Sequence, residues 1–370
     1  MKIASIDIMR TEAVEQPLYP YVKPTDYYLD LLGQVSPVKA ALLDQISFVR
    51  LRTDEGVESY IAASQMVAEF AVKISQILTG FELTEIGRAW DLLYRYSLPL
   101  GSGGLAMQSV SAVNLLMYDA LGKSLNVPVY TFLGGKTRDR IRAYASHLHP
   151  LPVEELKKEA LGYVDAGYKT MKMRFAAGPA DPYAVEKNLE LVKAVRDAVG
   201  YSIELASDAW MSWNYNFARN MLSRLEKYEL AWVEEPLLPD DFDGYKMLTR
   251  YSGTPISAGE HHYYLYDFKR LLESGVRILQ PDTVWTGGLT SMKRIAALAE
   301  AYGAVVIPHT SNIYNLHFTM SEKQAVAPIS EFLTKYREWM EQHVTNNPVP
   351  VNGYFKLPEG AGFGLKYDFN

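Results

Sequence analysis

The sequence contains no cysteine among its 370 residues. This absence excludes disulfide bridges and every metal site or nucleophile that depends on a thiolate. No apolar run approaches the roughly 20 residues that a membrane-spanning helix needs, so we expect no membrane segment. The alternating pattern that begins at Met1 also lacks the long apolar core of a signal peptide, and we therefore expect a cytoplasmic protein.

A long basic stretch is also missing, and the formal net charge is −6. We therefore expect no nucleic-acid partner, because such partners select clustered Lys and Arg. Apolar residues make up 48% of the chain, which is typical of a globular protein and excludes a disordered one. A chain of this length can bury a large core and form two domains. We expect a homo-oligomer that acts on a small molecule.

The first part of the chain, residues 1–135, has the pattern of a separate α+β domain. Gln45–Arg52 and Val57–Ala62 flank a turn signal, which predicts a β-hairpin. The residues that follow carry apolar side chains at helical spacing, most clearly in Ser109–Leu125. We predict that this domain caps a larger one.

A long segment without a regular pattern interrupts this first domain. Gln16–Lys39 is rich in Pro and Tyr, and loops of this length are uncommon in compact domains unless they have a function. A lid that closes over an active site and contacts the substrate is one such function. We expect this lid to decide which substrate is used, with Tyr19, Tyr21 and Lys23 as candidate contacts.

From Ile141 onward, predicted strands and helices alternate. The predicted strands are 141–147, 170–175, 202–208, 230–236, 255–260, 277–282, 304–309 and about 329–333. Eight strands that alternate with helices imply a parallel sheet. We predict a (β/α)8 TIM-like barrel over residues 136–344, with residues 345–370 packing back onto the capping domain. An open doubly wound sheet is the competing fold, but its ligands bind at a single switch point.

Acidic residues close three consecutive strands of this series. Asp208, Glu234 and Glu260 are 26 residues apart, about one strand, one helix and two loops. In a barrel the carboxyl ends of the strands face one mouth, where such enzymes carry out their chemistry. Acidic residues are also common helix N-caps, but three on consecutive strands favour a metal site. Three carboxylates predict a hard cation, and Mg2+ is the one that we expect.

The next two strands end in Asp282 and His309. A carboxylate bonded to one imidazole nitrogen fixes the tautomer and raises the basicity of the other nitrogen, so this pair predicts a general base. Lys172 and Arg174 lie on the second barrel strand and point to the same side. Either can neutralise a substrate carboxylate, and a salt bridge inside the barrel is an equal alternative for each. Glu331 on the eighth strand completes the ring of catalytic candidates.

Other candidates follow the strand ends. His261 comes directly after Glu260 and is a candidate proton donor, although His262 could face the site in its place. His147 and His149 follow the first barrel strand. Three aromatic residues in the barrel loops are candidate substrate contacts: Trp210, Trp285 and Tyr314.

The series Asp208, Glu234, Glu260, Asp282 and His309 resembles the enolase superfamily, in its mandelate-racemase-like branch. Longer blocks from about residue 90 onward are similar to the L-rhamnonate dehydratase family. These blocks include Gly101–Met107, Asp208–Ser212, Gly259–His262, Gln280–Gly288, Pro308–Ser311, Ser330–Leu333 and Pro348–Gly353. The resemblance implies a Mg2+-dependent acid-sugar (aldonate) dehydratase. His309 would remove the C2 proton, and loss of the 3-hydroxyl would give a 2-keto-3-deoxy acid.

Alternatives remain open at this stage. L-Rhamnonate is the first substrate that the resemblance implies, and D-arabinonate or another aldonate is the alternative. Racemases of the superfamily carry Lys-x-Lys on the second barrel strand, and Arg174 here replaces the second Lys. Residues 16–45 also do not clearly reproduce the substrate-binding His and Arg of the rhamnonate enzymes. A barrel that binds metal and ligand without turnover is the non-enzyme alternative, but binding alone does not need a poised base.

Overall fold

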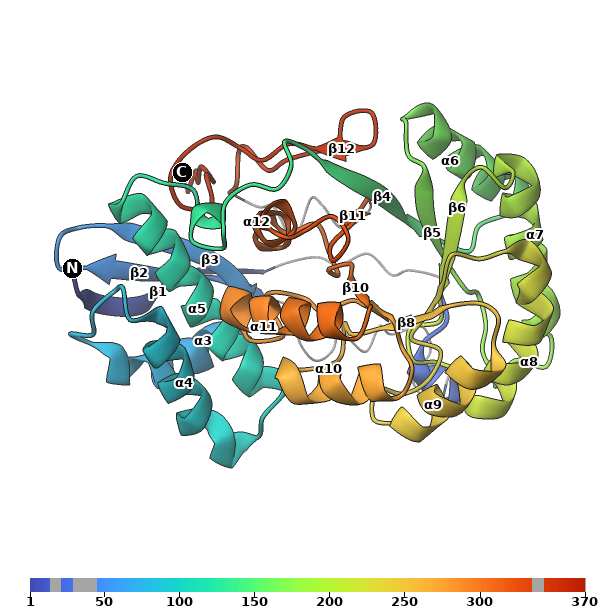
Figure 1. Cartoon of the computed structure of the whole chain (residues 1–370), viewed down its shortest axis with the longest axis horizontal. Helices are drawn as coiled ribbons and strands as arrows, with labels where there is room; N and C mark the ends of the chain where they lie inside the picture. The colour runs from blue at the N-terminus through green and yellow to red at the C-terminus, as the bar shows by residue number, and fades with distance from the viewer. Residues whose placement is uncertain (14–20, 29–44, 335–342, 370) are drawn as a thin grey trace.

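The computed structural model describes residues 1–13, 21–28, 45–334 and 343–369. The N-terminal part is a three-stranded antiparallel sheet of order β1-β2-β3, with helices packed beside it (Figure 1). Its strands are β1 (Ile3–Ala13), β2 (Gln45–Thr53) and β3 (Glu58–Ser64). Its helices are α3 (Gln65–Ser75), α4 (Ile86–Ser97) and α5 (Gly104–Ser124). The predicted hairpin and helical region are both present. Candidate contact Tyr19 lies outside the described residues.

The second part is a curled parallel sheet, and the predicted α/β barrel class is confirmed. Its strand order is β10-β9-β8-β7-β6-β5-β4-β11, so the eighth strand returns beside the first. The strands are β4 (Ile141–Leu148), β5 (Thr170–Arg174), β6 (Glu204–Asp208), β7 (Val233–Glu234), β8 (Ile256–Ala258), β9 (Ile278–Leu279), β10 (Val305–Val306) and β11 (Ser330–Leu333). Between β10 and β11 the Val306 N–H donates to the Val326 carbonyl (2.7 Å). The side-by-side strands therefore bring their carboxyl ends to one mouth.

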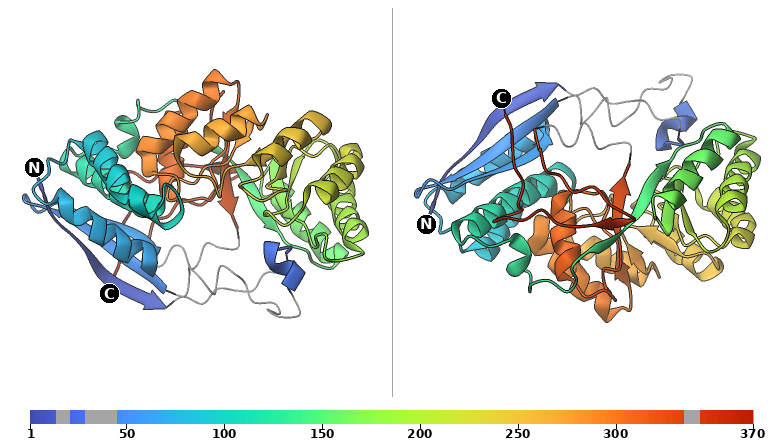
Figure 2. Two further views of the ribbon diagram at one scale, coloured as in Figure 1. Left: turned by 90° about the horizontal axis from the view of Figure 1, so that it is seen from below. Right: turned by 90° about the horizontal axis from the view of Figure 1, so that it is seen from above.

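Helices follow the strands and cover the outside of the sheet (Figures 1 and 2). They are α6 (Val153–Asp165), α7 (Ala184–Val199), α8 (Tyr215–Leu225), α9 (Phe242–Tyr251), α10 (Tyr264–Glu273), α11 (Gly288–Ala301) and α12 (Ile313–Ser321). Side-chain caps start three of them: Asn214, Asp241 and Asn312 each accept a hydrogen bond from a backbone N–H three residues on. Among the described helices, none combines the length and apolar character that crossing a bilayer requires.

Short elements complete the chain. The described residues also form the 3-10 helices η1 (Pro24–Tyr28), η2 (Gln76–Leu78), η3 (Leu98–Leu100), η4 (Val129–Thr131) and η5 (Glu226–Tyr228). β12 (Tyr354–Phe355) pairs antiparallel with β4. Both chain termini lie at the N-terminal sheet, as the two views of Figure 2 show.

The C-terminal segment contacts the N-terminal part of the chain. The Phe363 N–H donates to Asp119 Oδ1 (2.8 Å), and the Tyr367 hydroxyl donates to the Tyr60 carbonyl (3.1 Å). These two hydrogen bonds connect the segment to α5 and β3. The domain boundaries at residues 135/136 and 344/345 stay predictions.

Candidate active site

The strand ends that carry acidic residues lie side by side at one edge of the parallel sheet. Arg174 is opposite Asp208 across β5 and β6, and Asp208 is opposite Glu234 across β6 and β7. These side chains are buried. Buried charges are stable only when they are paired or bind a metal, so their contacts indicate what the site can hold.

Lys172 lies at the centre of the buried carboxylates. Its Nζ is 2.8 Å from Glu234 Oε1, 2.9 Å from Glu331 Oε1 and 3.4 Å from Asp208 Oδ2. Burial alone would lower the pKa of Lys172, but the charges of Glu234 and Glu331 raise it well above its ordinary value. Lys172 is therefore held protonated and serves as a fixed positive charge.

Arg174 supplies the second fixed cation. Its Nη1 is 2.5 Å from Asp208 Oδ2, and its guanidinium lies 4.9 Å from the centre of the Tyr21 ring. Lys172 and Arg174 therefore both form salt bridges inside the barrel, which was the alternative to a role in neutralising a substrate carboxylate. Both cations nevertheless border the strand-end carboxylates, so these ion pairs also place positive charge at the mouth.

The structure brings His309 and Asp282 together. His309 Nδ1 is 3.0 Å from Asp282 Oδ2, while Asp282 Oδ1 accepts from the Val284 N–H (2.9 Å) and from Asn312 Nδ2 (3.1 Å). These bonds fix the carboxylate and so fix the imidazole. The other nitrogen, His309 Nε2, is 3.3 Å from Glu260 Oε1. Burial lowers the pKa of His309, but Glu260 and Asp282 raise it to about 10.

Glu331 and the two histidines after β8 take distinct positions. Glu331 Oε2 accepts from the Thr310 N–H (2.6 Å), which ties the eighth strand to the loop that carries His309. His261, and not His262, turns toward the carboxylates; its Nδ1 is 2.6 Å from Glu235 Oε2. His262 Nε2 lies 3.0 Å from the Pro239 carbonyl oxygen and donates a hydrogen bond to it in the tautomer with a hydrogen on Nε2.

Glu235 is a site residue that sequence reasoning missed. Regular strand alternation would point Glu235 away from the side that Glu234 faces, but β7 ends at Glu234, and Glu235, with a φ of +37°, contacts His261. Burial would raise the pKa of Glu235, but His261 lowers it to about 2. The same pairing raises the pKa of His261 to about 9 against the effect of burial. Pro236 directly after Glu235 was the available signal, because Pro cannot donate to a strand ladder.

The donor set fits a hard divalent cation. Among the described residues, Glu235, Glu260 and His261 have ligand atoms within 4.8 Å of one another. Glu260 Oε2 is buried and accepts no hydrogen bond within the described part of the chain. The carboxylate oxygens of Glu235 and Glu260 are ligands of the kind that Mg2+ prefers, whereas the predicted ligands Asp208 and Glu234 contact Lys172 and are not part of this group. Within the described residues, the cations Lys172 and Arg174 and the imidazoles of His261 and His309 contact a group of six buried carboxylates: Asp208, Glu234, Glu235, Glu260, Asp282 and Glu331.

Four predicted substrate contacts border this cluster. The Trp210 ring lies 5.5 Å from Tyr21 and 6.1 Å from His261, measured between ring centroids. The Trp285 ring lies 5.5 Å from His261. Lys23 Nζ donates to the Tyr21 carbonyl (3.1 Å), so it lies one step further from the strand ends.

Tyr314 corrects one expectation. Its ring centroid is 4.7 Å from that of Phe363 in the C-terminal segment, so it faces away from the strand-end cluster. The next residue, Asn315, faces the cluster instead and donates from Nδ2 to the His309 carbonyl. Tyr314 was expected in a barrel loop, but it lies in the first turn of α12, where successive residues point about 100° apart. Tyr314 is therefore not proposed as a substrate contact.

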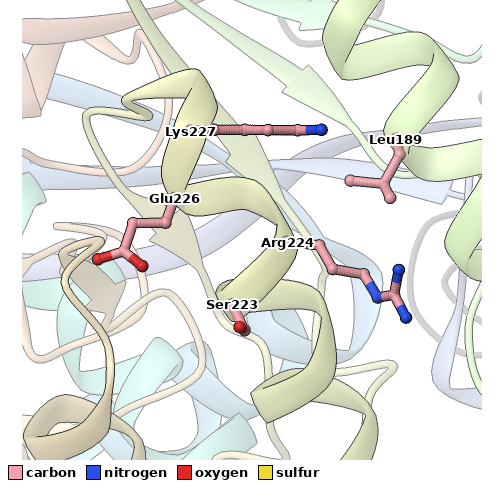
Figure 3. Close-up of a pocket in the computed structure, with 5 residues that line it drawn as sticks. All are labelled: Leu189, Ser223, Arg224, Glu226 and Lys227. Carbon is pink, nitrogen blue, oxygen red and sulfur yellow. The ribbon is translucent and has the colours of Figure 1, made fainter.

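A separate hollow of about 430 Å3 lies on the outer helices (Figure 3). It is lined by Leu189, Ser223, Arg224, Glu226 and Lys227, from α7, α8 and η5. None of these elements contributes a residue to the strand-end cluster. This hollow is therefore distinct from the candidate active site.

Residues 155–370 match the family model described as "Enolase C-terminal domain-like". This chain belongs to the enolase superfamily. It is 35% identical to an L-rhamnonate dehydratase of Saccharopolyspora erythraea over 303 residues, which cover 79% of this chain and 75% of that protein. The resemblance that the strand-end residues predicted is therefore confirmed.

Two solved structures are similar to this chain over its whole length. Rhamnonate dehydratase from Gibberella zeae, complexed with Mg, has a TM-score of 0.87 and 25% identity, covering 100% of this chain and 94% of that one. The 3,6-anhydro-D-galactonate cycloisomerase from Zobellia galactanivorans has a TM-score of 0.80 and 27% identity, covering 100% and 97%. The capped-barrel architecture of this superfamily member is thus shared by enzymes that act on sugar acids.

Proposed function

We propose that this protein is a Mg2+-dependent acid-sugar (aldonate) dehydratase with an L-rhamnonate-like substrate. The observation that carries the proposal is the His309–Asp282 pair, whose free nitrogen faces Glu260 in the buried carboxylate cluster. Relatives named as L-rhamnonate dehydratase support the substrate class. We also propose a cytoplasmic homo-oligomer.

Asp208, Glu234 and Glu260 would hold the cation, with Glu235 and His261 beside them. When bound, Mg2+ supplies positive charge that acidifies the C2–H next to the substrate carboxylate. The buried oxygen of Glu260 without a hydrogen-bond donor supports this assignment. Lys172 and Arg174 both lie against Asp208 Oδ2, at 3.4 and 2.5 Å.

In its neutral form, His309 would remove the C2 proton through Nε2. Glu260 and Asp282 raise its pKa to about 10 in the metal-free protein, and a cation held at Glu260 would offset the negative charge that causes this rise. Asp282 accepts a hydrogen bond from the Nδ1–H of His309. The neutral ring therefore carries its lone pair on Nε2, which is the tautomer that a base needs. Lys172 and Arg174 then stabilise the negative charge of the enediolate, because they remain cationic throughout. Glu331 orients Lys172 from the other side through a 2.9 Å ion pair.

Elimination completes the reaction. The electron pair from the broken C2–H bond forms the C2–C3 double bond, and the 3-hydroxyl leaves as water after it takes a proton. His261, held by Glu235, is the proposed donor of that proton, and His309 is the alternative donor. The resulting enol tautomerises to a 2-keto-3-deoxy acid.

Elimination is favoured over racemisation. A racemase needs a base on each face of the substrate, and the second barrel strand here offers a lysine held protonated and an arginine. Arginine does not deprotonate in proteins. One base on one face is sufficient for loss of water.

A panel of aldonates with keto-acid detection tests the proposal. We expect Mg2+-dependent formation of a 2-keto-3-deoxy acid from L-rhamnonate or a close stereoisomer. Interconversion of C2 epimers without keto-acid formation would replace the dehydratase by an epimerase. No turnover of any panel member, with Mg2+ bound, would favour the non-catalytic alternative.

A further inference from the structure

A chain of aromatic and imidazole rings runs along the candidate active site. We call it the ring collar; its members in order are His309, Trp285, His261, Trp210, Tyr21 and His149. Successive ring centroids lie 6.0, 5.5, 6.1, 5.5 and 5.6 Å apart. The predicted base is at one end of the collar, and His149 is at the other.

The collar joins residues from elements that are far apart in the sequence. Four of its rings follow the barrel strands β6, β8, β9 and β10, Tyr21 comes from the N-terminal part, and His149 follows the first barrel strand, β4. β4 lies between β5 and β11 in the sheet. β11 is also the strand that follows β10, so the collar curves round the mouth from β10 through β6 to β4.

Tyr21 is held firmly in the collar. Its neighbour Val22 donates a backbone hydrogen bond to the Phe175 carbonyl (3.0 Å). Gly178 leaves the space that the Val22 side chain occupies, because a Cβ at Gly178 would lie 3.1 Å from Val22 Cγ2. Arg174 covers the Tyr21 ring at 4.9 Å. The described part of the N-terminal loop thus forms a fixed wall of the site.

His149 extends this wall. Its side chain is 3% exposed, and its ring is stacked on Tyr21 with 7° between the two planes. Aromatic faces pack against the C–H groups of a sugar chain, and an imidazole can both donate to and accept from hydroxyls. The ring collar offers both aromatic faces and imidazole nitrogens, and it begins at the proposed base. It is therefore suited to bind a polyhydroxylated chain that extends away from the reacting C2.

We infer that His149 is a specificity-determining residue that contacts the distal hydroxyl groups of the substrate. The inference rests on the proposed function and adds a residue at the far end of the collar. A substrate with its C2 at His309 reaches His149 with the carbons beyond its reacting C2 and C3. A long aldonate therefore contacts His149, and a short one does not. A purely structural role, in which His149 only supports Tyr21, would affect both lengths equally.

The test combines two substitutions with two ligand lengths. His149→Ala removes the ring, and His149→Gln keeps an amide donor and acceptor if the Ala variant does not fold. His343→Gln is the matched control, because His343 bonds to Glu12 (2.7 Å) and to the C-terminal segment. The ligands are six-carbon aldonates and four-carbon aldonates with the same configuration at C2 and C3. Both kcat/KM and calorimetric binding in Mg2+ are measured.

Loss of a contact to a hydroxyl is worth roughly 1 kcal/mol, or about five- to tenfold in affinity. We expect His149→Ala to weaken six-carbon binding and kcat/KM by about that factor, to change four-carbon values less than about twofold, and His149→Gln to restore part of the loss. Equal losses for both lengths, or none for either, would overturn the inference. Keto-acid formation by the wild type tests the proposed function separately, since the binding measurement judges His149 without turnover.

Discussion

Replacing Lys172 with Met removes the cation at the centre of the carboxylate cluster. The substitution keeps most of the side-chain length and leaves Glu234, Glu331 and Asp208 without this positive charge. Both Lys172 and Glu234 are 1% exposed, so water cannot replace the lost partner. Breaking a buried ion pair on one side costs about 3–5 kcal/mol. We expect a loss of that size in the free energy of unfolding of the metal-free protein.

Chemical denaturation at pH 8 measures this loss. The control is Lys269→Met, which breaks an exposed pair with Glu273 and should change stability by less than about 0.5 kcal/mol. Burial already raises the pKa of Glu234 to about 7, so the deficit of the Lys172 variant should shrink at pH 6, where carboxylates can take up protons. Equal stability of the two variants at pH 8 would refute the assignment of Lys172 as the charge that balances the cluster.

Three further outcomes follow from particular contacts. Burial lowers the pKa of His317 to about 3, so the folded protein is destabilised as the pH falls below 6.5, where the unfolded chain takes up a proton at this residue. Chemical denaturation should show a free energy of unfolding about 2 kcal/mol lower at pH 5 than at pH 7. The variant His317→Gln should not show this part of the loss. Gly288→Ala should cost roughly 1–3 kcal/mol, because φ is +71° and the added Cβ collides with Asn114, whereas Gly87→Ala meets no atom within 4 Å and should be neutral or stabilising in thermal unfolding. Treatment with EDTA should abolish activity and added Mg2+ restore it, and full activity in demetallated protein would contradict the metal assignment.

The acidic residues and the histidine at the strand ends could be predicted from the sequence because the pattern that marks them is local. An apolar run followed by an acid or histidine marks a barrel strand and its last residue, and Asp208, Glu234 and His309 lie where such runs end. Glu235 could not be found in this way. Its position depends on one backbone angle, a φ of +37°, which overrides the alternation of the strand.

Contacts between distant segments were also beyond the sequence pattern. Tyr21 was a candidate because it lies in a Pro/Tyr-rich loop, but nothing local indicated that its ring would stack on His149. Tyr314 was expected in a barrel loop, but the structure places it in α12 with its ring against Phe363, and its neighbour Asn315 donates to the His309 carbonyl. Pattern analysis therefore predicts which strands carry chemistry better than which loop side chains meet there.

Hydrogen–deuterium exchange in D2O measures whether His309 removes the C2 proton. With Mg2+ present, the wild type should convert its aldonate into a 2-keto-3-deoxy acid with deuterium at C3. His309→Asn should bind Mg2+ and fold, yet form no keto acid and incorporate no deuterium at C2 of the substrate. Persistent exchange or product formation by this variant would contradict the account and move the role of base to another residue.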